Sequence, residues 1–185
     1  MKSSFFITLI AAVTFFIACG RGSDQTATAE VNEIQKKVES DSNAEFTWYT
    51  DWDKGIEAAK KDNKPVIIDF YADWCHWCKV MDEKTFSAAE ITDRFSNGWI
   101  AIKVNSEDKN KQATYDGNTM SYPELVRYFK VSGFPSYLFI DKEGKPVTIV
   151  SSYIPKERFG PMLDYMKDEL YKKDIKFSDY LESKS

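Results

Sequence analysis

Histidine and cysteine are scarce in this chain of 185 residues, which contains one histidine and three cysteines. A structural zinc site needs about four Cys or His ligands. His76 lies between Cys75 and Cys78, where it cannot readily complete a tetrahedron with both thiols, and Cys19 is far away in the sequence. Covalent haem attachment needs a histidine directly after Cys-x-x-Cys, but Lys79 follows Cys78. The sequence therefore argues against a metal site, and no cofactor is expected.

Basic charge is also in short supply. The chain has 25 Lys and Arg residues against 29 Asp and Glu, which gives a net charge of −4 at pH 7. No segment of the sequence interleaves clustered basic residues with aromatic ones. Because nucleic-acid binding depends largely on the neutralisation of phosphates, this composition argues against a nucleic-acid partner.

The longest apolar run is short. It extends over 14 residues, from Phe5 to Ala18. In a helix that rises about 1.5 Å per residue, this length is too small to cross a hydrocarbon core of about 30 Å. The run follows Lys2, and a positive start before a short apolar stretch is typical of an export signal. Residues 1–18 are therefore predicted to be a signal peptide.

The end of this run resembles the bacterial lipoprotein signal, in which a small residue precedes a cysteine that becomes lipidated. Here Ala18 precedes Cys19. We expect lipidation of Cys19, and ordinary cleavage near Gly20 is the alternative. Residues 19–45 are polar and poor in aromatic side chains, which predicts a flexible tether.

The other two cysteines form the motif Cys75-His76-Trp77-Cys78, directly after the apolar run 66–71. A strand that turns into a helix at such a motif places the first sulfur at the helix N-terminus. Unpaired N–H groups and the helix dipole favour a thiolate there. Because the thiolate attacks disulfides, the motif indicates redox chemistry with an exposed Cys75 sulfur. A structural disulfide is the alternative, although a bridge across so short a loop removes little chain entropy.

Hydrophobic patterning predicts one globular domain over residues 46–172 and a charged tail over 173–185. Strands and helices alternate before a final hairpin and helix. This order predicts an α/β fold with a central mixed sheet and helices on both faces. Residues 105–121 are read as a long polar segment. The expected elements are a helix over 51–61, strand 66–71, helix 75–85, helix 88–95 capped by Ser87, strand 99–104, helix 122–130, strands 136–140 and 146–152, and a helix from 155 or 156.

Two signatures make the chain similar to the thioredoxin superfamily. The first is the stretch 64–79, which contains the strand and Ala72-Asp73-Trp74-Cys75-x-x-Cys78. The second is Gly133-Phe134-Pro135 before an apolar strand. Within the superfamily, the chain resembles the C-terminal thioredoxin-like domain of thiol:disulfide interchange proteins of the DsbD type. The resemblance covers roughly residues 46–171 and implies the thioredoxin fold.

The resemblance implies a catalytic set of four residues. Cys75 is the attacking cysteine, and Cys78, which is expected to be the more buried, is the resolving one; together they form the redox-active disulfide. Asp69 is implied to be a buried carboxylate that assists proton transfer at the resolving thiol, and burial raises the pKa of such a group. Lys103 is implied to lie near Asp69. A charge at a strand end and a solvated lysine are the alternatives for these two positions.

The resemblance also implies a substrate-binding groove beside the dithiol. Pro135 is expected to be cis and to present its backbone to a substrate strand. Phe134 is expected to form an apolar wall of the groove, and Trp74 part of its rim. His76 and Trp77 replace the Gly-Pro of thioredoxin; they are expected to contact the substrate and to tune the redox potential of the pair. An exposed residue with little influence is the alternative for His76.

These observations predict an exported thiol:disulfide oxidoreductase that reduces protein disulfides through a mixed-disulfide intermediate. An oxidase or isomerase is the alternative, and a binding module with a structural disulfide is an alternative of another class. The expected partners are protein disulfide or dithiol substrates, a redox partner that supplies electrons, and a membrane reached through the lipid anchor. The expected location is the periplasmic side of the bacterial cell envelope. Ser152-Tyr153 departs from the family pattern, because thioredoxins carry a substrate-contacting glycine there.

Overall fold

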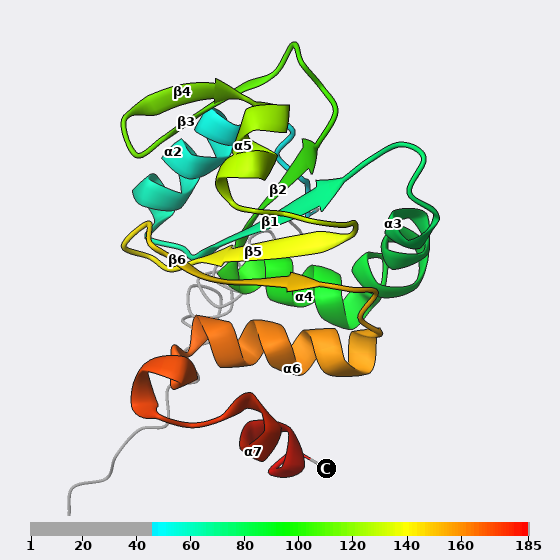
Figure 1. Ribbon diagram of the computed structural model, residues 1–185. Coiled ribbons are helices and arrows are strands. Elements are labelled where there is room, and N and C mark those ends of the chain that lie inside the picture. Colours follow the sequence, from blue (N-terminus) through cyan, green and yellow to red (C-terminus); the bar gives the residue numbers. More distant parts are fainter. Residues whose placement is uncertain (1–45, 185) are drawn as a thin grey trace, which may run out of the picture. The chain divides into compact units, whose positions relative to one another are not determined.

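Residues 46–184 are described by the computed structural model, and they form a sheet with helices on both faces (Figure 1). The predicted signal peptide 1–18, the predicted lipidation site Cys19 and the predicted tether 19–45 lie outside the described residues. Within residues 46–184, no helix combines the length and the apolar character needed to cross a membrane.

The elements follow the order that the sequence predicts. The structure adds a hairpin within the polar segment 105–121 and two short helices at the C-terminus. The first eight are α2 (Trp52–Asp62), β1 (Val66–Tyr71), α3 (His76–Met81), the π-helical η1 (Asp82–Phe86), α4 (Ala89–Gly98), β2 (Ile100–Asn105), β3 (Gln112–Tyr115) and β4 (Asn118–Ser121). The remaining ones are α5 (Tyr122–Tyr128), β5 (Ser136–Ile140), β6 (Pro146–Ser151), α6 (Lys156–Lys167), η2 (Leu170–Lys173) and α7 (Phe177–Glu182).

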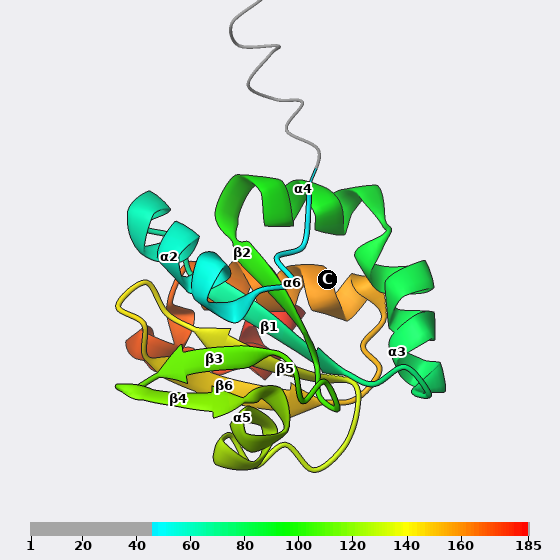
Figure 2. The ribbon, with the colours of Figure 1, turned by 90° about the horizontal axis from the view of Figure 1, so that it is seen from above.

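The main sheet has the strand order β2-β1-β5-β6 and is mixed. Strand β1 pairs in parallel with β2 and antiparallel with β5, and β5 pairs antiparallel with β6. Helices α2 and α5 lie on one face, and α4 and α6 on the other (Figures 1 and 2). The predicted mixed sheet with helices on both faces is therefore confirmed.

Strand β1 is buried on both of its faces, as its continuous apolar run predicts. Successive side chains of a strand point to opposite faces. Ile68 and Phe70 accordingly pack with the core beneath α2 and α5, whereas Ile67 packs with the core beneath α4 and α6. Asp69 shares the face of Ile67, so a carboxylate is placed inside an otherwise apolar layer.

The polar segment 105–121, for which the sequence predicted no strand, is not an irregular loop. Strands β3 and β4 form an antiparallel hairpin within it. Its two-residue turn is Asp116-Gly117, with φ of 50° and 73°. An Asp-Gly pair with two left-handed residues is the typical turn of a tight hairpin. The turn signal was present, but the flanking strands lack the apolar alternation by which strands are recognised.

The helix after the cysteine motif also differs from the prediction. The expected helix 75–85 is divided into α3 and the wider turn of η1. The next helix, α4, has Ala88 as its N-cap, without a side-chain hydrogen bond. Ser87 does not cap it, because its hydroxyl donates to the Glu83 carbonyl at 2.7 Å, at the end of η1.

The C-terminal residues pack against α6. The ring of Tyr165 on α6 lies 5.3 Å from that of Phe177 and 5.7 Å from that of Tyr180, measured between centroids. Its hydroxyl donates to the Ile175 carbonyl at 2.6 Å. Helix α7, which lies within the predicted charged tail, is therefore held on α6 by aromatic contacts.

Candidate active site

The two cysteines lie where β1 turns into α3, and they form a disulfide. Cys75 is the N-cap of α3, and Cys78 lies in its first turn. The Cys75 sulfur accepts a hydrogen bond from the Cys78 backbone N–H at 3.1 Å. A donor at a helix N-terminus stabilises negative charge on such a sulfur, so the same geometry favours a thiolate after reduction.

The sequence predicted an exposed Cys75 sulfur and a more buried Cys78. Both predictions are wrong for this disulfide form. Cys75 is only 3% exposed and Cys78 is 5% exposed. The two residues pack in a small cluster with Ala72, and Tyr71 and Phe134 cover it. These shielding contacts come from the tertiary fold, which a local motif does not reveal.

Trp74 lies exposed beside Phe134, on one side of the rim around the disulfide. Its side chain is 67% exposed, and its ring lies 6.0 Å from that of Phe134. The indole N–H donates to a carboxylate oxygen of Glu107 at 3.0 Å. Glu107 was missed by sequence reasoning, because it lies in the polar segment that carried no motif.

Trp77 forms another side of the rim. It is 54% exposed, and its ring lies 5.5 Å from that of Tyr153 and 5.6 Å from that of His76. His76 is exposed beside it. The family departure at Tyr153 therefore places an aromatic ring next to the dithiol motif.

The proline loop comes before β5. The Phe134–Pro135 peptide bond is cis, which is the isomer that the resemblance implies. The Ser136 hydroxyl lies 2.6 Å from the Gly133 carbonyl, to which it donates, and 2.6 Å from the Ser151 hydroxyl on β6. These contacts fix the loop to the sheet, while Phe134 covers the disulfide cluster.

Asp69 is a buried carboxylate on β1, with 2% of its surface exposed. Lys103 is its register partner on β2, and its Nζ lies 3.7 Å from Asp69 Oδ2. Burial raises the pKa of Asp69 to about 7, because the charged form loses its hydration, while the Lys103 ammonium opposes the rise. A group with this pKa exchanges protons near neutral pH.

Asp82 joins this charged pair and was missed from the sequence. It lies on η1 and forms an ion pair with Lys103, whose ammonium also lies 5.2–5.7 Å from the rings of Trp48, Tyr71 and Phe86. The negative charge of Asp82 adds to the rise in the Asp69 pKa. Its position four residues after Cys78 on the same helical stretch was a usable signal.

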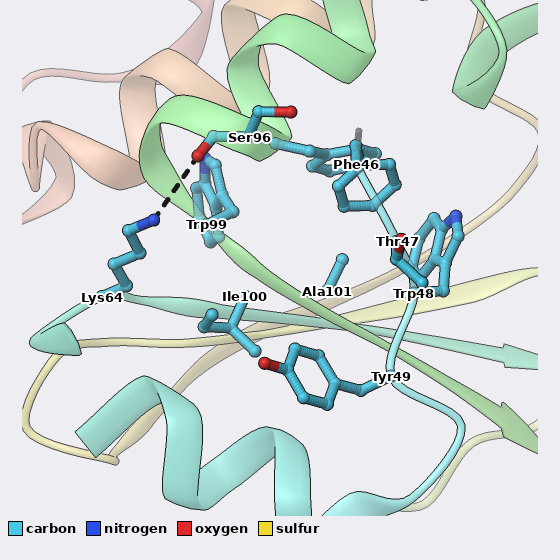
Figure 3. A pocket seen from close by; sticks show the side chains of 10 residues that line it. Phe46, Thr47, Trp48, Tyr49, Lys64, Ser96, Trp99, Ile100 and Ala101 are labelled. Carbon is cyan, nitrogen blue, oxygen red and sulfur yellow. Dashed lines mark hydrogen bonds between the residues drawn. The ribbon is translucent and has the colours of Figure 1, made fainter. Parts of the chain in front are cut away.

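An apolar pocket of about 430 Å³ lies elsewhere, between residues 46–49, α4 and the start of β2 (Figure 3). On one side, the Nζ of Lys64 donates to the Ser96 carbonyl at 3.4 Å. None of the predicted site residues that the structure describes lines this pocket. The pocket is therefore separate from the dithiol site.

Comparison with known proteins identifies the fold family. A family model of the thioredoxin-like domain matches residues 52–167. The chain belongs to the thioredoxin-like domain family. The matched region of this thioredoxin-like chain includes the dithiol motif, Asp69, Lys103 and the proline loop.

The thioredoxin-like chain is similar to proteins named for disulfide chemistry. The thiol:disulfide interchange protein DsbD of Colwellia psychrerythraea is 29% identical over 118 residues, which cover 63% of this chain and 18% of DsbD. The disulfide bond reductase DsbH of Chlamydia pneumoniae is 32% identical over 93 residues, which cover 50% of this chain and 55% of DsbH. These relatives support thiol:disulfide exchange as the general reaction.

Solved structures agree with this assignment. A DsbH oxidoreductase has a TM-score of 0.55 at 25% identity and covers 69% of this chain and 88% of its own. A thioredoxin from Thermus thermophilus has a TM-score of 0.53 at 20% identity and covers 70% of this chain and 91% of its own. The second likeness shows the fold alone, and the thioredoxin fold is confirmed.

Proposed function

We propose that this protein is an exported thiol:disulfide oxidoreductase that reduces protein disulfides through Cys75 and Cys78. The observation that carries the proposal is their disulfide at the start of α3, with the Cys75 sulfur accepting a backbone N–H. The name of the similar protein DsbH, a disulfide bond reductase, supports the reducing direction.

The reaction begins from the reduced pair. The Cys75 thiolate attacks one sulfur of a substrate disulfide, which forms a mixed disulfide and releases the other substrate sulfur as a thiolate. Cys78 then attacks Cys75, so the second substrate thiolate leaves and the Cys75–Cys78 disulfide forms. The substrate gains two electrons and leaves as two thiolates, which take up protons from the solvent, and the protein releases the one proton of the Cys78 thiol. The disulfide form is the product of this reaction.

Asp69 and Lys103 serve the second attack. Asp69 accepts the proton that the Cys78 thiol loses, since a carboxylate with a pKa of about 7 is a base of suitable strength at neutral pH. Lys103 offsets the cost of an ionised buried carboxylate through its ammonium, 3.7 Å from Asp69 Oδ2. Asp69 lies on β1, the strand that leads into α3, and Lys103 lies opposite it on β2.

The substrate lies as an extended segment along the proline loop. Pro135 presents the backbone of the loop to this segment, and Phe134 supplies the apolar wall. Trp74, His76 and Trp77 contact the residues beside the substrate cysteine. The strong exposure of the two tryptophans supports this role, because a large exposed apolar side chain commonly marks a binding surface.

Export and anchoring complete the proposal. Residues 1–18 direct export, lipidation of Cys19 attaches the chain to a membrane, and the domain acts on the periplasmic side of a bacterial envelope. That compartment is oxidising, so a redox partner must return electrons to the Cys75–Cys78 disulfide after each cycle.

The decisive experiment is substrate trapping with Cys78→Ala in the full chain. Without the resolving thiol, Cys75 should remain joined to its substrates, and dithiothreitol should release them. Cys75→Ser with Cys78 intact is the matched control and should trap far less. An absence of dithiothreitol-sensitive adducts with Cys78→Ala would contradict the proposal and favour a binding module with a structural disulfide.

A further inference from the structure

Within residues 46–184, two buried polar atoms on neighbouring strands have no hydrogen-bond partner. They are Oδ1 of Asp69 and the hydroxyl oxygen of Tyr137, and both residues are at least 98% buried. Tyr137 on β5 is the register partner of Asp69 on β1. Residues opposite each other in an antiparallel pair share a sheet face, with Cβ atoms about 5 Å apart.

The Tyr137 side chain lies in the core beneath α4 and α6, on the sheet face that Asp69 shares. Its ring is held between Phe86 at 5.9 Å and Phe159 at 5.5 Å, measured between centroids. Burial raises the pKa of the Tyr137 hydroxyl most strongly, and the negative charges of Asp69 and Asp82 raise it further. Tyr137 is therefore a neutral donor that faces a carboxylate.

The groups that face Asp69 can be named element by element. Lys103 faces it from β2, Asp82 from η1 and Tyr137 from β5, while Tyr71 on β1 interacts electrostatically with it. Lys103 reaches Oδ2, which leaves Oδ1 without a donor. Tyr71 belongs to the same strand as Asp69, whereas Tyr137 lies directly opposite Asp69 on the neighbouring strand.

We propose that Tyr137 is a positioning residue for Asp69. One buried water molecule links the hydroxyl of Tyr137 to Oδ1 of Asp69 by hydrogen bonds. An unpaired buried polar atom is costly, and a water that links two such atoms removes both costs. The inference deepens the proposed function, because it concerns the group that takes the proton from Cys78.

The consequence is a specific effect on proton transfer. A hydrogen bond donated to a carboxylate favours its charged form. Tyr137 therefore keeps Asp69 ionised at lower pH than burial and the charge of Asp82 would allow. Loss of the hydroxyl should shift the Asp69 titration upward by about one pH unit, as expected for one lost donor to a charged group.

The test is Tyr137→Phe in the full chain, with carbon-13 NMR titration of the Asp69 carboxyl and the pH profile of insulin reduction. We expect both midpoints to move upward together. Tyr122→Phe is the matched control, since it removes another buried hydroxyl, which contacts Trp52 N and Thr50 O on the opposite face. It should leave both midpoints unchanged.

An Asp69 midpoint in Tyr137→Phe within about 0.3 pH units of the wild type would overturn the inference. Should this variant not fold, the Cζ resonance of Tyr137 in the wild-type chain gives the answer. The chemical shift of that resonance must change with the same midpoint as the Asp69 titration. A Cζ chemical shift that stays constant through the Asp69 titration would also overturn the inference. The NMR readouts need no reductase activity, so failure of the proposed function alone would appear as inactivity with the Tyr137 coupling intact.

Discussion

Asp69 illustrates how one residue combines opposing influences. Burial raises its pKa most strongly, the ammonium of Lys103 lowers it, and the carboxylate of Asp82 raises it again. The balance gives a pKa of about 7, against the ordinary value of 3.8. The ionised form is thus disfavoured in the folded protein compared with the unfolded chain, and this links stability to pH.

Replacement of Asp69 by Asn should remove that link. In the wild type, the raised pKa contributes stability that is complete below pH 4 and is lost as the pH rises through about 7. Asp69→Asn should abolish this slope and increase the free energy of unfolding at pH 8 by about 2–4 kcal/mol. Urea denaturation of the disulfide form at pH 5 and pH 8 provides the measurement. Asp93→Asn on the exposed surface of α4 is the control, and an unchanged slope in Asp69→Asn would refute the assignment.

Lys103 should act on Asp69 in the opposite sense. Its ammonium lowers the pKa of Asp69, so Lys103→Met should raise that pKa above about 7 and leave Asp82 without its partner. Carbon-13 NMR titration of the Asp69 carboxyl measures the change directly. Lys79→Met, on the exposed side of α3, is the matched control. A lower pKa of Asp69 in Lys103→Met would show that the two groups do not interact as described.

The residues that act together were only partly predictable. Cys75, Cys78 and Pro135 lie in motifs, and the pairing of Asp69 with Lys103 follows from two adjacent buried strands. The shielding of Cys75 was not predictable, because Phe134 covers it from a loop distant in sequence. The same holds for Glu107 and Tyr137, which complete the site from other elements.

At the scale of elements, the close approach of α2 to β2 depends on one glycine. A Cβ atom at Gly55 would lie 2.5 Å from Cδ1 of Ile102 and 3.3 Å from Cβ of Tyr49. Ile102 is fully buried, so it has little room to move. The helical pattern of 51–61 predicted α2 correctly, but no pattern in the sequence indicates that a small residue is needed at this crossing.

Gly55→Ala should therefore destabilise the fold despite the better helix propensity of alanine. We expect a net loss of about 1–2 kcal/mol in the free energy of unfolding, because overpacking costs more than the better helix propensity of alanine restores. Ile102→Val removes the obstructing Cδ1, so the double variant should lose less than the sum of the two single changes. Strict additivity in urea denaturation would contradict the contact. Gly133→Ala, where a Cβ meets nothing within 4 Å, should have little effect.

The hairpin of β3 and β4 shows how tertiary contacts organise a polar sequence. The indole N–H of Trp52 donates to the Thr114 carbonyl at 3.1 Å, and the Thr114 N–H donates to Asp53 at 2.8 Å. Both partners belong to the first turn of α2. The strands of this hairpin are thus specified by polar contacts to α2, which hydrophobic periodicity cannot detect.

At the scale of the whole molecule, the fold places the dithiol pair and the buried carboxylate of Asp69, its proposed proton acceptor, at one end of the sheet. Strand β1 carries Asp69 into the layer between the sheet and α6, and then leads into Cys75 at the start of α3 (Figure 1). The aromatic rim surrounds the disulfide on the outside. This arrangement is suited to electron exchange in either direction, so the direction depends on the relative stability of the two redox forms.

The reduction potential of the Cys75–Cys78 pair tests the account most directly. It is obtained by equilibrating the full chain with glutathione buffers and following the fluorescence of Trp74 and Trp77. A reductase predicts a reversible two-electron transition with a potential below about −200 mV, toward the value of about −270 mV for thioredoxin. A potential near about −120 mV, as in strong oxidants, or a disulfide that does not titrate at all, would contradict it.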